Sequence, residues 1–574
     1  MKDPWVRAQF RSTVTRRVLS IVVVTQFVAL VSVSFLVGDN GWDDGAVTLA
    51  FARTFARHGR IALTPYSETV EGFSSVSWFL LNALAALGGT AYRSSIVIAQ
   101  ILSALCICAC TLLLARTSAL LRLEPRVSFL AIVTCAAWGC SFSEASNGME
   151  MGLLAAAILA IVNELLSPEP RVAWLVAGVA VALTTRFEAG LYVGLLALSV
   201  GVVPPRRAFW GIVLSCIGTV SLLTVWRLTA FSDILPNTFW AKRWPPYAAF
   251  GLSGRLTGAL ELPRSFLGPL IALPIVLPIV LPIVHRFHRF RRLGFDVVGV
   301  LRARRRAFLI LAAPLAGAVV MGALTGEHWG YRGRMPYFAF PPALLALALL
   351  FSSWVEARGG RLPVAIAAGS FLFCAVTSMT GFPSGSLSAA FAGGAFGVTP
   401  HTYAESGRVF RRFAAVAGVQ TPAILTPDLG GLALSWPEMR AVDLGMLSNR
   451  TLAHAGPSAL GDVLAKESPH IIEAHGMWAA SGRLYESPLF QASYRAAFGD
   501  GTRFWIRRDL VEAIESQGRG CWLDVARPSV RAALDAHRYH NHQWPEDARA
   551  FENAGNVFAI PQADPTSARL CQSR

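Results

Sequence analysis

The chain leaves its first apolar segment, residues 18–37, with the sequence GDNGWDDGAVTLAFARTFARH at residues 38–58. An apolar run of about 20 residues predicts a membrane-spanning helix, and no small-residue cleavage pattern follows it, so we expect the run to remain as an anchor. Within 38–58 an apolar residue recurs at every fourth position from Val47 to Phe55, with basic residues on the other faces. This spacing predicts an amphipathic helix that lies along the membrane surface.

The composition excludes a purely soluble globular protein. Of 574 residues, 54% are hydrophobic and only 15% are charged, whereas soluble domains carry about a quarter charged residues. The formal net charge is +16, but no basic run interleaved with aromatics occurs in the region expected to be exported. We therefore interpret the surplus as a sign of membrane topology and expect no nucleic-acid partner.

Further apolar runs follow along the first 380 residues. Together with the first run, eight are long enough to span a bilayer: 18–37, 94–115, 149–166, 208–226, 265–284, 307–325, 337–354 and 362–380. Shorter runs at 127–142, 172–185 and 189–203 bring the expected number of spans to eleven. Serines and Asn82 interrupt the run 73–90, for which we predict a half-buried helix that does not cross.

The distribution of basic residues sets the expected orientation. If 73–90 does not cross, the inner loops hold 21 Lys or Arg in 66 residues and the outer loops hold 12 in 113. This bias agrees with the positive-inside rule. We therefore expect a multi-pass protein of the bacterial cytoplasmic (inner) membrane, with the N-terminus cytoplasmic and the C-terminal region periplasmic or extracellular.

From residue 381 onward the composition becomes mixed. Short apolar runs begin at Ala423, Arg440, His470 and Phe504, and they are typical of buried strands between helices. The sequence thus predicts two domains, a mainly α transmembrane domain over 1–380 and a small exported α/β domain over 381–574. Cys521 and Cys571 both lie in the second domain, where an oxidising compartment would allow a disulfide between them.

Acidic residues concentrate in the loops and helix ends expected on the outer side, together with several arginines and Lys242. Carboxylates and cations that converge on one membrane face suit a site that deprotonates an acceptor hydroxyl and binds a lipid phosphate. Simpler alternatives exist for individual residues. Asp43 and Asp44 can cap the helix that follows them, Arg186 and Glu188 can form a structural ion pair, and Arg332 and Arg334 can contact membrane lipid headgroups.

Six segments in this order resemble the pattern of multi-spanning GT-C glycosyltransferases, and most closely the terminal arabinofuranosyltransferase family of actinobacterial cell-wall synthesis. They are Trp42 to Arg53 with Val70 to Trp78, Asn147-Gly-Met-Glu150, Arg186-Phe-Glu188, Leu235-Pro-Asn-Thr-Phe-Trp-Ala-Lys242, Gly326-Glu327 to Arg334, and Asp443-Leu-Gly-Met-Leu447. The resemblance implies a GT-C-like bundle with a surface helix pair in its first outer loop.

The resemblance also implies the chemistry. A polyprenyl-phosphate-linked sugar, expected to be D-arabinofuranose, would be the donor, and Asp43 or Asp44 would take the proton of the acceptor hydroxyl. Because adjacent helical residues point about 100° apart, we expect only one of the two to face the acceptor. Substrate-binding residues would be Arg53, Glu71, Glu150, Arg186, Glu188, Asn237, Lys242, Glu327, His328, Arg332 and Arg334.

Several points stay open at this level. Glu71 can bind sugar hydroxyls or cap the half-buried helix, and relatives of this kind allow a divalent cation at the Asp43–Asp44 pair, although no His/Cys ligand spacing occurs. The acceptor can be a glycan, a lipid or a protein. The alternative functions are a GT-C enzyme for another lipid-linked sugar, such as mannose or aminoarabinose, and a lipid or glycan transporter.

Overall fold

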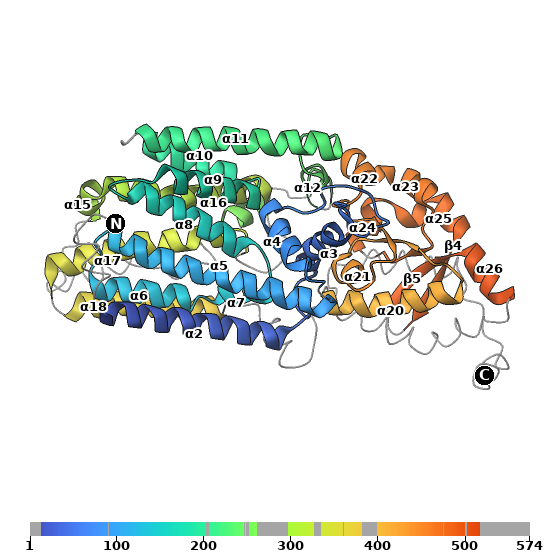
Figure 1. Cartoon of the computed structure of the whole chain (residues 1–574), viewed down its shortest axis with the longest axis horizontal. Coiled ribbons are helices and arrows are strands. Elements are labelled where there is room, and N and C mark those ends of the chain that lie inside the picture. Colours follow the sequence, from blue (N-terminus) through green and yellow to red (C-terminus); the bar gives the residue numbers. More distant parts are fainter. Residues whose placement is uncertain are drawn as a thin grey trace.

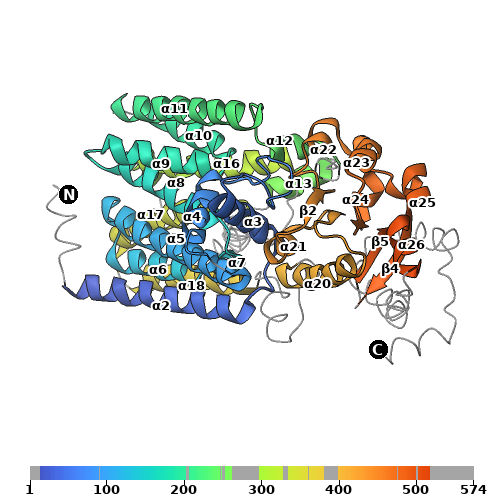
Figure 2. The ribbon, with the colours of Figure 1, turned by 45° about the vertical axis from the view of Figure 1, so that its right-hand side comes forward.

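The computed structural model describes residues 13–89, 91–201, 206–245, 247, 252–260, 297–326, 334–359, 361–380, 399–474, 476–499 and 502–516. The described part is mainly helical. A bundle of long helices occupies one end of the molecule, and a unit built around a five-stranded sheet occupies the other (Figure 1). Helices α3 and α4 lie between the two, as a second view also shows (Figure 2).

Within the described residues, six helical segments are long and apolar enough to cross a membrane, which makes the chain compatible with an α-helical membrane protein. They are α2 (Thr13–Val37), α5 (Tyr92–Leu120), α6 (Pro125–Ala136) continued by α7 (Gly139–Asn147), α11 (Arg206–Phe231), α16 (Arg305–Thr325), and the 3-10 turn η3 (Tyr337–Ala339) continued by α17 (Phe340–Arg358). Shorter apolar helices are α4 (Val76–Ala86), α8 (Met151–Leu166), α9 (Val172–Thr185), α10 (Ala189–Gly201) and α18 (Arg361–Thr380).

The expected apolar spans correspond to helices wherever the structure describes them, whereas the run 265–284 lies outside the described residues. The run 127–142 differs from expectation because it is divided between α6 and α7. The break falls at Ala137 and Trp138, whose indole is fully buried and stacks on Phe340 at 3.6 Å between ring centroids. The run 149–166 forms the short helix α8, which is buried on nearly all faces against α5, α9 and other helices of the bundle.

Helix α3 (Asp43–His58) begins with Asp43 and Asp44 and ends at Gly59, which adopts a left-handed φ of +66°. This helix, which we expect at the membrane surface, packs against α4 and α21 of the sheet-containing unit, and nine of its residues are buried. Helix α4 lies in the run 73–90 and is partly buried within the protein. Trp78 and Phe79 face the interior, while Leu84 and Leu87 at its end are exposed.

The sheet-containing unit has strands β1 (Ala423–Thr426), β2 (Arg440–Asp443), β3 (Ile471–Ile472), β4 (Tyr494–Gly499) and β5 (Thr502–Arg507) in the order β2-β1-β3-β5-β4. Strands β2, β1 and β3 are parallel, whereas β5 pairs antiparallel with both β3 and β4. The four runs expected as strands thus form β1, β2, β3 and β5. Strand β4 was not anticipated.

Side chains of the strands alternate between two cores, as a pleated strand requires. Ile424, Ile471 and Phe504 share one core with α3, α4 and α20 (Pro400–Val416). Leu425, Ile472 and Trp505 face the other core, which helices on the opposite side of the sheet complete. The remaining helices of this unit are α21 (Gly430–Ser435), α22 (Arg450–Ala455), η4 (Pro457–Ala459), α23 (Leu460–Glu467), α24 (Gly476–Ser481), η5 (Leu484–Glu486), α25 (Pro488–Ser493) and α26 (Arg508–Ser516).

Short helices α12 (Asn237–Ala241), α13 (Leu252–Ala259) and α15 (Val297–Ala303) complete the described part. Helix α15 lies at the end of the bundle away from the sheet (Figure 1). Close in sequence to it, Arg304 and Arg306 donate to the carbonyls of Leu121 and Leu165. Near Leu165, Glu164 pairs with Arg116 and Arg171 at 3.2 and 2.8 Å. Three loops with the arginine content expected of the inner side are therefore held together.

The contact between α3 and α21 depends on small residues. A Cβ atom on Gly430 would lie 2.3 Å from the carbonyl oxygen of Asp43, and a Cβ atom on Gly431 would lie 2.1 Å from that of Pro400. Both distances are far below van der Waals contact. The backbone of α21 can therefore approach its neighbours closely only with glycine at these two positions.

We expect Gly430→Ala to lower the thermal unfolding temperature of the detergent-solubilised protein, with a cost of about 1–3 kcal/mol for forced overpacking. Gly461→Ala is the matched control, because Gly461 lies in α23 and a Cβ there meets nothing within 4 Å. In that helix alanine should be neutral or stabilising by up to about 1 kcal/mol. Equal unfolding temperatures for the two variants would contradict the tight α3–α21 contact.

Candidate functional site

Asp43 faces the sheet-containing unit. Its carboxylate is buried and accepts the backbone N–H groups of Gly430 at 2.8 Å and Gly431 at 2.7 Å, at the start of α21. Burial, and to a smaller extent the nearby charge of Asp428, raise the pKa of Asp43 from 3.8 to about 8 against the opposing effect of the two N–H groups. Both oxygens of this carboxylate are therefore engaged by the protein.

Arg53 contacts the other end of the same short helix. Its guanidinium donates to the carbonyls of Leu434 and, at 2.9 Å, Ala433. Burial lowers the pKa of Arg53 to about 10. Helix α3 thus places a carboxylate at the N-terminal end of α21 and a cation at its C-terminal end, which is the charge order that a helix dipole favours. Asp43 and Arg53 hold the two parts of the molecule together.

Asp44 points elsewhere. Its side chain is 46% exposed, and its Oδ2 accepts a hydrogen bond from Nη1 of Arg334 at 2.9 Å. Arg334 is buried and is the first described residue after the gap 327–333. The expected site residues Glu327, His328 and Arg332 belong to that gap and lie outside the described residues. Of the expected pair, Asp44 is therefore the carboxylate that remains accessible to a ligand.

Further charges surround Asp44. Lys242, at the C-terminal end of α12, lies within electrostatic range of Glu188, Arg186, Arg334 and Asp44. Lys242 keeps accessible surface, but desolvation of its ammonium by the groups around it lowers its pKa. Arg186 and Arg334 lower it as well, whereas Glu188 and Asp44 oppose the shift. The structure thus gathers four expected site residues around Lys242: Asp44 of α3, Arg186 and Glu188 between α9 and α10, and Arg334 before η3.

Arg186 and Glu150 form a buried ion pair, with Nε 3.2 Å from Oε1. The expected alternative was a pair between Arg186 and Glu188, and the structure gives Arg186 the partner Glu150 on a different helix boundary. Nη2 of Arg186 also lies 3.2 Å from the sulfur of Met335, next to Arg334. Glu150 therefore fixes the position of Arg186 beside the loop that carries Arg334.

The sheet-containing unit adds acidic and phenolic groups to this region. Asp428 follows β1 and Asp443 ends β2, and the charges of both, with that of Asp44, act on Tyr247. Burial raises the pKa of Asp443 to about 7. The hydroxyl of Tyr403 donates to Asp428 at 2.6 Å. We did not expect Asp428, Tyr247 or Tyr403 from the sequence, although acidic residues after parallel strands signal a candidate site.

Two side chains that we expected to bind substrate form hydrogen bonds or ion pairs with other parts of the protein. Glu71 forms a buried, bidentate ion pair with Arg227 of α11 at 2.6 and 2.9 Å, and burial raises its pKa although Arg227 opposes this shift. Asn237 donates through its amide to the carbonyls of Met446 at 3.0 Å and Leu447 at 2.8 Å. Both side chains join the bundle to neighbouring segments.

Among the residues that the structure describes, no group of three or more His, Cys, Asp or Glu side chains could hold a metal ion. The two aspartates considered as a cation site, Asp43 and Asp44, have different partners. Asp43 accepts two backbone N–H groups, and Asp44 pairs with Arg334. Of the nine cysteines, Cys521 and Cys571 lie outside the described residues.

Replacing Asp43 by Asn should destabilise the protein, because its NH₂ group would take the place of one accepting oxygen and face one of the two N–H donors, at a cost of about 1–3 kcal/mol. The folded protein retains a proton on Asp43 up to a pKa of about 8, whereas the unfolded chain loses it near 3.8. The contribution of Asp43 to stability is thus largest at low pH and falls as the pH rises through this window. We expect the unfolding-temperature gap between wild type and Asp43→Asn to shrink from pH 5 to pH 8; parallel pH profiles would refute this.

The Glu71–Arg227 pair makes a second stability prediction. Glu71→Gln or Arg227→Met alone should cost about 3–5 kcal/mol, because each leaves a buried charge without its partner. The double variant Glu71→Leu/Arg227→Met removes both charges and should recover most of the lost unfolding temperature. A double variant that is as unstable as the sum of the single ones would show that the two side chains act independently.

No protein-family model matches the chain, and no curated protein matches its sequence.

Proposed function

We propose that the protein is an integral membrane glycosyltransferase that moves a sugar from a polyprenyl-phosphate donor to an acceptor hydroxyl on the outer side of the cytoplasmic membrane. The observation that carries the proposal is the exposed carboxylate of Asp44 among the cations of Arg334, Lys242 and Arg186. A group that takes a proton then lies next to groups that stabilise a departing phosphate.

In the proposed reaction the acceptor oxygen attacks the anomeric carbon, and the bond from that carbon to the phosphate oxygen breaks. Asp44 takes the hydroxyl proton, and the polyprenyl phosphate leaves with the bonding electron pair. Asp44 suits this role better than Asp43 because it keeps accessible surface, whereas both Asp43 oxygens accept backbone N–H groups. The negative charge that develops on the leaving phosphate would be stabilised by Lys242 and Arg334.

The topology is part of the proposal. Eleven spans, counting the run 265–284 and the shorter helices, would place the N-terminus in the cytoplasm and the sheet-containing unit in the periplasm or outside the cell. The arginine contacts around Glu164 support this orientation, because they gather loops of the expected inner side at the end of the bundle away from the sheet. The proposed site is then at the outer ends of the helices, level with the lipid headgroups.

The donor sugar that we propose is D-arabinofuranose, on the basis of the ordered motifs that resemble arabinofuranosyltransferases. Mannose and aminoarabinose are the alternative lipid-linked sugars, and the acceptor is a glycan, a lipid or a protein. A lipid or glycan transporter is a weaker candidate, because transport sites typically lie near the middle of the membrane. Here the charges gather where the bundle meets the sheet-containing unit.

Asp44→Asn should lower turnover by about 10²–10⁴-fold, the usual contribution of a general base, with an unchanged unfolding temperature. The assay would follow transfer from synthetic polyprenyl-phosphoryl arabinofuranose to short glycan acceptors by purified protein. Folded Asp43→Asn protein should retain much more turnover than Asp44→Asn.

The matched control is Glu405→Gln, since Glu405 is 44% exposed and pairs with an arginine but lies in α20. It should leave turnover unchanged. Full turnover by Asp44→Asn would remove Asp44 as the base. Turnover only with polyprenyl-phosphoryl mannose or aminoarabinose would change the donor, and neither turnover nor binding with any of these lipids would favour the transporter.

A further inference from the structure

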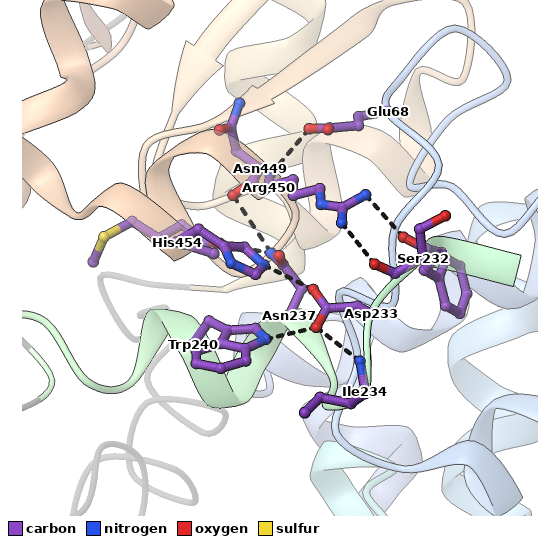
Figure 3. A network of polar contacts seen from close by, with 12 residues as sticks. Glu68, Ser232, Asp233, Ile234, Asn237, Trp240, Asn449, Arg450 and His454 are labelled. Carbon is purple, nitrogen blue, oxygen red and sulfur yellow. Dashed lines mark hydrogen bonds and ion pairs between the residues drawn. The ribbon is translucent and has the colours of Figure 1, made fainter. Parts of the chain in front are cut away.

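The segment that carries Lys242 runs from the end of α11 to Tyr247. It contains α12, and along its length the described contacts join it to residues 445–456 of the sheet-containing unit (Figure 3). Lys242 lies in the middle of this segment. Its place relative to Asp44 therefore depends on how the segment is attached.

Asp233 lies at the start of the attachment. Its Oδ2 lies 2.7 Å from Nε2 of His454, at the end of α22, and its Oδ1 accepts from the indole N–H of Trp240 at 3.0 Å and the backbone N–H of Ile234 at 2.9 Å. The ring of Trp240 lies 5.0 Å from that of His454. One carboxylate thus connects α22 to Ile234 in the turn before α12 and to Trp240 within α12.

Backbone contacts fix the same segment on either side. Arg450 donates to the carbonyls of Phe231 at 2.8 Å and Ser232 at 3.0 Å, before Asp233. After Lys242, the indole N–H of Trp244 donates to the carbonyl of Ala453 at 2.9 Å, and the hydroxyl of Tyr247 donates to that of Gly445 at 3.0 Å. The ring of Trp244 lies against Gly456, where a Cβ would meet it at 2.8 Å.

Lys242 lies between these attachments, and the charges that act most on its ammonium belong to Glu188, Arg186, Arg334 and Asp44. We call the residues that attach the segment, Asp233, His454 and Arg450, the clamp. The clamp and the charged residues around Lys242 thus meet at one short stretch of backbone.

We propose that Asp233 and His454 are positioning residues, through which the sheet-containing unit sets the place of Lys242 at the proposed donor-phosphate site. The identity of the ligand in this inference rests on the proposed function. The attachment of the segment by the clamp does not depend on that function. It makes the sheet-containing unit part of the site for the donor and not only a domain that selects the acceptor. Neither Asp233 nor His454 touches the reacting atoms.

The chain offers an unusually direct readout, because it has only three lysines, Lys2, Lys242 and Lys466. Competitive acetylation of the full-length protein over a pH series, followed by mass spectrometry, gives the pKa of each amine without any turnover. Lys466 is 71% exposed and serves as the internal standard. In wild type the pKa of Lys242 should lie below its ordinary value of about 10.4, because the surrounding protein disfavours its charged form.

His454→Ala should raise the Lys242 pKa toward the ordinary value of about 10.4 and leave that of Lys466 unchanged. It should also raise the KM for the lipid-phosphate donor about tenfold, with a smaller effect on the KM for the acceptor. His454→Gln should restore both, since its amide can donate to Asp233 as the ring does. Trp240→Phe loses only one N–H donor, so it should raise the Lys242 pKa and the KM for the donor by a smaller amount.

The matched control is His401→Ala. His401 also joins the sheet-containing unit to the bundle through an aspartate, with Nδ1 3.3 Å from Oδ2 of Asp39, but its contact is with the first loop. If Asp233→Asn and His454→Ala change the Lys242 pKa no more than His401→Ala does, the positioning role is refuted. If they do change it, but polyprenyl phosphate fails to protect Lys242 of the wild type from acetylation, the clamp stands and the proposed donor site fails.

Discussion

The arrangement of the whole molecule depends on the way α3 holds α21. Asp43 accepts the first N–H groups of α21 and Arg53 binds its last carbonyls, so that each charged side chain satisfies backbone groups that a helix end leaves unpaired. The glycines at the start of α21 permit the approach, and the shared core of α3, α4, α20 and the sheet supplies the apolar contact. Asp44, one residue further along α3, is directed to Arg334 as a result.

Three further contacts extend this junction. Glu71 and Arg227 fix the first loop to α11, Glu150 and Arg186 connect two helix boundaries, and Asp233 with His454 fixes the α12 segment. All three are ion pairs or charged contacts between segments that are distant in sequence. Buried pairs of this kind add little net stability compared with apolar contacts, but they penalise any arrangement in which one partner is missing. Their effect is to specify one relative position of the bundle and the sheet-containing unit.

Sequence patterns predicted the helices and four of the five strands, because apolar periodicity and burial are local properties of the chain. They also singled out Asp44, Arg186, Lys242 and Arg334, which the structure brings together. The roles of Asp43, Arg53, Glu71 and Asn237 could not be predicted, because each partner is a backbone group or an arginine more than 150 residues away. The cover on the apolar face of α3 could not be predicted for the same reason, because it comes from a unit that follows much later in the chain.

The separation between Asp43 and the glycine N–H groups that it binds, 387 and 388 residues, also has a meaning for synthesis. At about 5–20 residues per second, α3 emerges roughly 20–80 s before α21 exists. During that interval the side chains of Asp43 and Arg53 lack the backbone partners that they have in the folded protein, and Asp44 is not yet oriented. The residues of the proposed site would then come together only when the last part of the protein docks onto the first.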